Sequence, residues 1–63
     1  DEQLTLAQAM DRLPEEQRQV LELKFLVGLT NSEVAAALGK TTGAVNTKQW
    51  RALEALRQTL GER

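Results

Sequence analysis

Hydrophobic residues recur along this chain at helical spacing, and proline or glycine separates one run from the next. Leu6, Met10 and Leu13 are spaced i, i+4 and i+7 and predict a first helix over about residues 5–12. Pro14 disfavours helical backbone at the residue before it, so this helix is expected to end there. No segment shows the sustained alternation of apolar and polar residues that marks a half-buried strand. The pattern therefore predicts an all-α fold.

A second helix is predicted over residues 14–27, because proline suits the first helical turn and Glu15 and Glu16 suit its positive end. Gly28 is expected to end this helix in a left-handed conformation. The helix is apolar on more than one side, at Val20, Leu21, Leu23, Phe25, Leu26 and Val27. It should lie in the middle of a helical bundle or offer an apolar groove to a partner.

Two further helix starts follow with one glycine between them. Thr30 and Glu33 have the spacing of a capping box and predict a short helix over residues 31–38, which Gly39 closes. A longer helix is predicted over residues 42–60. Its expected inner face consists of Val45, Gln49, Ala52 or Leu53, Leu56 and Leu60. The chain is therefore predicted to be a four-helix domain.

Residues 39–41 form the short, glycine-containing connection that joins the two helices of a helix-turn-helix. In that motif the first helix braces the second, whose N-terminal turns enter a DNA major groove and whose free amides suit phosphate. Cations and short hydrogen-bonding side chains in this segment are the candidate DNA-binding residues: Lys40, Thr41, Thr42, Asn46, Thr47, Lys48 and Arg51. The alternative is that the threonines only cap the helix and the cations form a solvated face.

The length of 63 residues suits one small domain, and the chain begins at Asp1 rather than methionine. We therefore expect residues 1–63 to be a single domain excised from a longer protein. Cysteine and histidine are absent, which removes disulfides, thiolate metal sites and the usual general base. Neither an enzyme nor a bound metal or cofactor is expected. No membrane-spanning run or signal peptide is evident, so we expect a cytoplasmic protein with no membrane partner.

Charge is unevenly distributed between the two parts of the chain. Residues 1–38 carry three basic and seven acidic side chains, a net charge of −4, whereas residues 39–63 carry five basic and two acidic side chains, a net charge of +3. Such asymmetry indicates that the basic part meets a polyanion. The alternative is scatter, because a small number of charges often looks uneven.

Several short motifs follow one another in a fixed order: Leu13-Pro14, Val20-Leu21, Gly28-Leu29-Thr30, Glu33-Val34-Ala35, Leu38-Gly39 and Gly43-Ala44-Val45. This ordered set resembles region 4 of bacterial RNA polymerase sigma factors, most closely those of the extracytoplasmic-function type. The resemblance covers about residues 9–60. Two positions depart from it, because Gln49 stands where a buried leucine is usual and Leu53 stands where a further arginine is often found.

The resemblance implies that the last helix binds the −35 promoter element. It also implies that other faces dock on the beta flap of core RNA polymerase and on an anti-sigma factor. Carried over to this chain, Asn46 and Lys48 contact base edges, where each bidentate contact is worth about 1–3 kcal/mol of discrimination. Thr41, Thr42 and Arg51 are then positioned on phosphates. The residues that line the polymerase groove, or alternatively belong to the core, are Leu6, Met10, Leu23 and Leu26.

Two other functions stay open on the sequence alone. The stretch GLTNSEVA also fits the LuxR-like helix-turn-helix of response regulators, although the Leu-Pro opening and the second turn glycine do not. A sigma-like protein-interaction module without DNA binding would suit the modest basicity of the last helix. Trp50, next to Arg51, is expected to cover the edge of the core rather than contact DNA or a partner.

Overall fold

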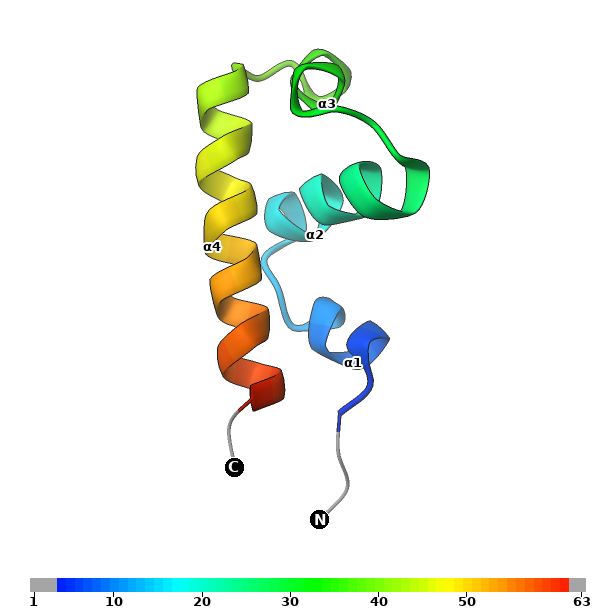
Figure 1. Ribbon diagram of the computed structural model, residues 1–63, viewed down its shortest axis with the longest axis vertical. Coiled ribbons are helices and arrows are strands. Elements are labelled where there is room, and N and C mark those ends of the chain that lie inside the picture. The colour runs from blue at the N-terminus through cyan, green and yellow to red at the C-terminus, as the bar shows by residue number, and fades with distance from the viewer. Residues whose placement is uncertain (1–3, 62–63) are drawn as a thin grey trace.

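One long helix organises the molecule, and the shorter helices pack along one side of it (Figure 1). The computed structural model describes residues 4–61, so the charges of Asp1, Glu2, Glu62 and Arg63 lie outside the described residues. No strand occurs within residues 4–61, and the predicted all-α fold is confirmed. The elements are α1 (Leu6–Asp11), α2 (Glu15–Leu21), the π-helix η1 (Glu22–Val27), α3 (Asn31–Leu38) and α4 (Thr42–Gly61).

The ends of the short helices follow from local capping interactions. Thr30 Oγ1 accepts a hydrogen bond from the Glu33 N–H at 3.1 Å, and Glu33 Oε1 accepts one from the Thr30 N–H at 2.8 Å. The predicted capping box is therefore confirmed. Thr5 and Gln8 form a second capping box at the start of α1. Gly39 ends α3 with a φ of 67°, as predicted, because a residue without a Cβ adopts this conformation readily.

The predicted second helix does not stay α-helical to its end. At Glu22, α2 gives way to the wider turn of η1, which the hydrophobic pattern did not indicate. The Gly28 N–H donates to the Leu23 carbonyl at 3.1 Å, which is the i to i−5 pairing of a π-helix. Gly28 has a φ of 94°, so the predicted left-handed end is confirmed. Three apolar side chains of η1 are more than half exposed: Phe25, Leu26 and Val27.

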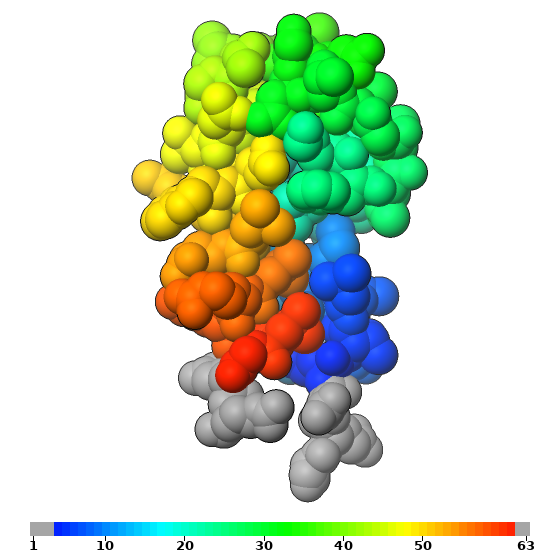
Figure 2. All heavy atoms as spheres, in the orientation of Figure 1, coloured from blue at the N-terminus to red at the C-terminus, as the bar shows by residue number. Residues whose placement is uncertain are grey.

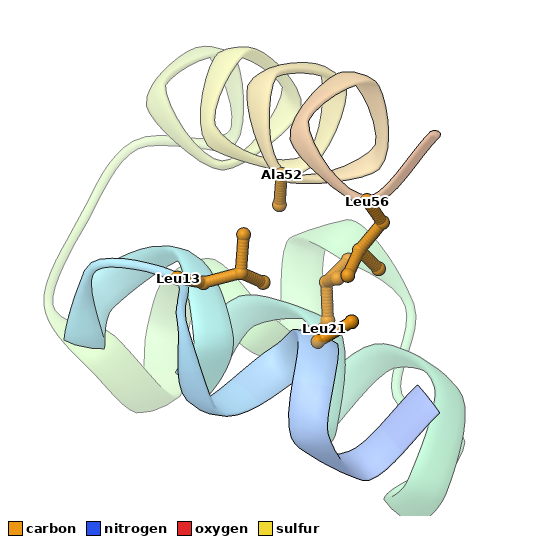
Figure 3. Close-up of a cluster of buried hydrophobic side chains, with 5 residues drawn as sticks. Leu13, Leu21, Ala52 and Leu56 are labelled. Carbon is orange, nitrogen blue, oxygen red and sulfur yellow. The ribbon is translucent and has the colours of Figure 1, made fainter. Parts of the chain in front are cut away.

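Buried side chains form two clusters along α4. The first joins α1 and α2 to the C-terminal half of α4 and consists of Ala9, Leu13, Leu21, Ala52 and Leu56. Figure 3 shows Leu13, Leu21, Ala52 and Leu56 gathered between α4 and the helices that pack against it. The second joins α2 and α3 to the N-terminal half of α4 and consists of Val20, Val34, Ala35 and Val45. Because adjacent residues of α2 belong to different clusters, this helix links the two parts of the core.

The inner face of α4 agrees with the predicted one except at its C-terminal end. Ala52 is fully buried and Leu53 is 43% exposed, which decides between the two candidates for that place. Leu60, predicted to face inward, is 41% exposed, so that prediction was wrong. Leu6, for which a partner-facing and a core position were both open, is 58% exposed and does not belong to the core. Both lie where α1 meets the last turns of α4 (Figure 1). The six-residue α1 fills its contact with Ala9 instead, and no other described element covers the two leucines.

Candidate nucleic-acid interface

Helix α3 holds the start of α4 through buried aliphatic contacts. Val34 of α3 and Val45 of α4 are both fully buried and belong to the same cluster. Ala35 is buried beside them, and its small side chain permits the close approach of the two helices. Ala36 and Ala37 are exposed instead. The α3–α4 pair with its short turn is the predicted helix-turn-helix (Figure 1).

The turn between α3 and α4 is closed by two backbone hydrogen bonds. The Lys40 N–H donates to the Ala35 carbonyl at 2.9 Å, and the Gly39 N–H donates to the Ala36 carbonyl at 3.4 Å. This pair of bonds is the Schellman arrangement that commonly follows a helix when glycine occupies the left-handed position. The backbone of the turn is therefore set by α3, which fixes the direction in which α4 begins.

The first turn of α4 presents amides and small polar groups to solvent. Thr41 Oγ1 accepts a hydrogen bond from the Ala44 N–H at 3.1 Å and so caps the helix. Thr42 and Gly43 are exposed, and no acceptor within residues 4–61 takes their backbone N–H groups. Free amides at a helix start, together with the helix dipole, favour a bound anion.

A polar face continues along the next two turns of α4. Asn46, Thr47 and Arg51 are exposed on the side away from the core. Trp50 lies among them and is 66% exposed, so the prediction that it covers the edge of the core was wrong. The reason is its position two residues before Ala52, which places it about 200° around the helix from that buried residue.

Two of the candidate cations converge on one carboxylate of α2. Lys48 Nζ lies 2.9 Å from Glu16 Oε1, and Lys40 Nζ lies 3.2 Å from Glu16 Oε2. The hydrogen bonds and charges of Lys48 and Lys40 hold the pKa of the Glu16 carboxyl below its ordinary value. Lys48 therefore lies on the flank of α4 that faces the start of α2, and not on the outer face with Asn46 and Arg51.

Polar side chains also connect α3 with α4. The Asn31 Nδ2 group donates to the side-chain oxygen Oδ1 of Asn46. Asn31 Oδ1 and Gln49 Oε1 are buried and have no partner within residues 4–61. Gln49 is the polar residue that interrupts the apolar stripe of α4, and its unpaired oxygen costs about 1–3 kcal/mol of stability relative to a paired one.

The free positive charge on α4 is smaller than the sequence count indicates. Arg57 donates to Glu54 from its Nε at 3.4 Å, and this contact lowers the pKa of the Glu54 carboxyl. Lys40 and Lys48 are paired with Glu16. Within the described residues, Arg51 makes no ion pair, which leaves it the most available cation of the candidate set.

The residues predicted to face a protein partner separate into exposed and partly buried ones. Leu6 on α1 and Leu26 on η1 are exposed, whereas Met10 and Leu23 pack against the two core clusters. Phe25 and Val27 belong to the helix that was expected to lie in the bundle or to offer a groove, but not to the predicted partner-facing set, and with Leu26 they form an apolar surface at the tip of η1. The signal for it is the run LKFLV, which is longer than one face of a helix buries.

Comparison with known proteins identifies the family of the chain. The family model described as "Sigma-70, region 4" matches residues 3–56. The chain belongs to the sigma-70 region 4 family. The match to region 4 spans every element from α1 to most of α4 and contains all the candidate DNA-binding residues. The predicted resemblance is therefore confirmed.

Curated relatives of this region 4 chain are named as ECF RNA polymerase sigma factors. SigD of Mycobacterium tuberculosis (strain ATCC 25618 / H37Rv) is 47% identical over 51 residues, which are 81% of this chain and 24% of that protein. BldN of Streptomyces coelicolor is 40% identical over 55 residues, 87% of this chain and 21% of that protein. ShbA of Streptomyces griseus is 51% identical over 45 residues, 71% of this chain and 24% of that protein.

The region 4 chain spans about a quarter of the length of these relatives. Among its described residues, no helix is long and apolar enough to cross a bilayer. Residues 4–61 also contain no group of acidic side chains arranged to hold a metal ion.

Proposed function

We propose that this domain acts in transcription initiation by binding the −35 promoter element with the start of α4. The observation that carries the proposal is the exposed polar face of Asn46, Thr47 and Arg51, which follows a capped helix start and is braced by α3. The names of the relatives support it, because they are RNA polymerase sigma factors. In this proposal the domain binds promoter DNA and positions it relative to RNA polymerase.

Each part of this face suits a different group on DNA. The backbone amides of Thr42 and Gly43 and the guanidinium of Arg51 suit phosphates, which set the register of the helix on the duplex. Asn46 and Thr47 then face base edges. The Asn46 Oδ1 accepts a hydrogen bond from Asn31 Nδ2 and keeps a second lone pair, so bidentate contact of the Asn46 side chain with adenine remains available.

Lys40 and Lys48 suit phosphates on the flank of the contact. Lys48, predicted from the resemblance to contact a base edge, pairs with Glu16 of α2, and we therefore assign it to the backbone of the duplex. The whole contact includes about four or five phosphates, and each contributes about −0.9 to the log–log dependence of affinity on salt. Binding by this domain alone is then weak at physiological salt, and tethering to polymerase supplies the missing affinity through effective concentration.

The apolar surface at the tip of η1 suits a protein partner. Phe25, Leu26 and Val27 form a contiguous stretch of exposed apolar side chains in a small domain. Exposed apolar patches on small proteins commonly mark interaction sites. We assign this surface to docking on the beta flap of RNA polymerase, and an anti-sigma factor that covers it would block that docking.

A second candidate function is a protein-interaction module without DNA binding. It is favoured by the pairing of Lys40, Lys48 and Arg57 with carboxylates, which leaves little free positive charge on α4. The LuxR-like alternative loses support, because the region 4 family model matches residues 3–56.

An NMR titration of the isotope-labelled chain tests the first proposal. The probe is a short duplex with a GGAAC-type upstream element, added at low and at moderate salt and compared with a scrambled duplex. We expect amide shifts concentrated at residues 41–51 that weaken with salt and with scrambling. Absence of shifts there at low salt, with the fold intact, would contradict DNA binding and favour the protein-interaction module.

A pair of arginine variants sharpens this test. Arg51→Ala removes the cation that makes no ion pair within the described residues and should weaken DNA binding several-fold, with a salt dependence shallower by about 0.9. Arg57→Ala removes a cation of the same helix that Glu54 already neutralises, and it should change affinity much less. Equal losses for the two variants would show that only net charge matters and that the assigned face does not.

A further inference from the structure

The contact among Glu16, Lys40 and Lys48 joins three segments that are distant in sequence. Glu16 lies in the first turn of α2, Lys40 lies in the turn before α4, and Lys48 lies in the second turn of α4. Each carboxylate oxygen of Glu16 pairs with a different lysine, at 2.9 and 3.2 Å. No other carboxylate in residues 4–61 pairs with two cations.

We propose that Glu16 is an internal competitor of DNA phosphate for Lys40 and Lys48, and that it weakens and tunes DNA binding by this domain. This inference rests on the proposed function. A carboxylate offers two anionic oxygens to two ammonium groups, as a phosphate does with its non-bridging oxygens. The two lysines are therefore already arranged around an oxyanion, and that oxyanion belongs to the protein.

The contact is accessible enough for exchange with a phosphate. The Glu16 side chain is 53% exposed, and those of Lys40 and Lys48 are 35% and 31% exposed. Ion pairs at such exposed positions contribute little to stability, so a phosphate can displace the carboxylate without unfolding the domain. Lysine suits this exchange because its compact ammonium on a flexible stem pairs with either anion.

The net charge of Glu16, Lys40 and Lys48 indicates whether removing Glu16 should raise or lower DNA affinity. With Glu16 ionised, the three groups carry a net charge of +1 instead of +2, and the displaced carboxylate stays close to the arriving phosphate. A unit negative charge about 7 Å from a phosphate lowers affinity by about threefold in water. Removing the charge of Glu16 should therefore strengthen DNA binding rather than weaken it.

The test compares two variants of neighbouring glutamates, Glu16→Gln and Glu15→Gln, by fluorescence anisotropy with a labelled duplex at several salt concentrations. Both substitutions remove one charge from the first turn of α2, so their effects on net charge and on the helix dipole are matched. Glu15 pairs with Arg18 and makes no ion pair with a lysine of α4. We expect Glu16→Gln to bind about threefold or more tightly, with a salt dependence steeper by about 0.9 for each lysine that gains a phosphate. Glu15→Gln should change affinity less.

A third substitution tests whether the gain in DNA affinity of Glu16→Gln requires the paired lysines. In a Lys48→Gln background, Glu16→Gln should strengthen binding less than it does in the wild-type chain. The wild-type chain offers a readout that needs no substitution: the side-chain Nζ resonances of Lys40 and Lys48 should shift when the duplex is added. If both resonances keep their free-state positions in the complex, the inference is wrong.

The remaining outcomes separate this inference from the proposed function. Equal gains for Glu16→Gln and Glu15→Gln would overturn the inference alone, because net charge would explain both. Weaker binding by Glu16→Gln, with an unchanged amide spectrum, would overturn it by showing that Glu16 positions the lysines for DNA. If neither the wild-type chain nor Glu16→Gln binds any duplex at low salt, the proposed function fails and this inference fails with it.

Discussion

The tip of η1 and the start of α4 are both exposed, but they present opposite chemistry. The η1 surface consists of Phe25, Leu26 and Val27, and it carries no charge or hydrogen-bonding side chain. The start of α4 presents free amides, Asn46, Thr47 and Arg51. Figure 2 shows these two segments on opposite sides of the part of the molecule that contains α3. One small core thus supports two surfaces that suit different partners, a protein and a nucleic acid.

The two surfaces are supported by the same buried cluster. We therefore expect both surfaces to depend on the core. The cluster of Val20, Val34, Ala35 and Val45 lies under both, because α3 packs against η1 as well as against α4. Substitutions in the core should therefore affect both surfaces. Substitutions on one surface should leave the other intact.

The largest effect is expected from Leu56→Ala, in the cluster that holds α4 against α1 and α2. Removing this buried side chain should lower the free energy of unfolding by about 2–5 kcal/mol, which is a large part of the stability of a small domain. Both surfaces should be lost together, as measured by urea unfolding and by the amide spectrum. Leu53→Ala, three residues away and 43% exposed, is the matched control and should cost much less. A similar loss for both would contradict the assigned inner face of α4.

The next largest effect is expected from a substitution that weakens binding of a protein partner and leaves DNA binding unchanged. Leu26→Ser at the tip of η1, where the side chain is 76% exposed, should weaken binding to the isolated beta-flap domain of RNA polymerase about tenfold or more. The amide shifts caused by DNA at residues 41–51 should not change. Leu6→Ser on α1 tests whether the docking surface extends to the other end of the molecule. If Leu26→Ser alters the DNA-induced shifts, the two surfaces are not independent.

A smaller change in stability is expected at the border between the core and the proposed DNA-binding face. Gln49→Leu replaces a side chain whose buried Oε1 has no partner in the described residues, so it should raise the free energy of unfolding by about 1 kcal/mol. Thermal unfolding measures the change, and the DNA titration should keep its pattern. Gln58→Leu, at an exposed position of the same helix, should give no comparable gain. If Gln49→Leu lowers the stability, its amide has a partner that the structure does not contain.

The smallest effect is the pH dependence that comes from Glu16. Lys48 and Lys40 lower the pKa of this carboxyl in the folded chain below its ordinary value near 4.5. Its contribution to stability is therefore fully present above about pH 4.5 and is lost as the pH falls through the lower, folded-state pKa. The midpoint of thermal unfolding should fall between pH 5 and 3 by less in Glu16→Gln than in the wild-type chain. An identical pH dependence in the two chains would show that the ion pairs do not persist in solution.

The helix-turn-helix was predictable because its boundaries depend on contacts within three or four residues. Thr30 and Glu33 cap each other, and Gly39 takes the left-handed conformation that closes α3. The start of α4 was predictable for the same reason, since Thr41 caps it. The candidate DNA-binding residues follow from these boundaries, because residues in the first turns of an exposed helix share a known spacing.

Other features were not predictable from spacing alone. Helical periodicity places Ala52 and Leu53 almost equally well on the inner face of α4. Ala52 is the buried one because α1 and α2 pack against its side of the helix. Trp50 is large and apolar, which favours burial, yet it lies opposite the contact with α2. The hydrophobic pattern also carries no signal for the π-helical turn of η1, in which the Gly28 N–H donates to the Leu23 carbonyl.

The sequence by itself determined the all-α fold and where most of the helices start and stop, because capping and proline or glycine effects are local. The boundary between α2 and η1 at Glu22 is the exception. Only the tertiary structure decided which surfaces stay exposed and which charges meet. Glu16 lies 24 residues before Lys40 and 32 before Lys48 along the chain, so their contact exists only once α2 has packed against α4. Local interactions act before the helices have positions relative to one another, whereas burial and long-range ion pairs depend on those positions.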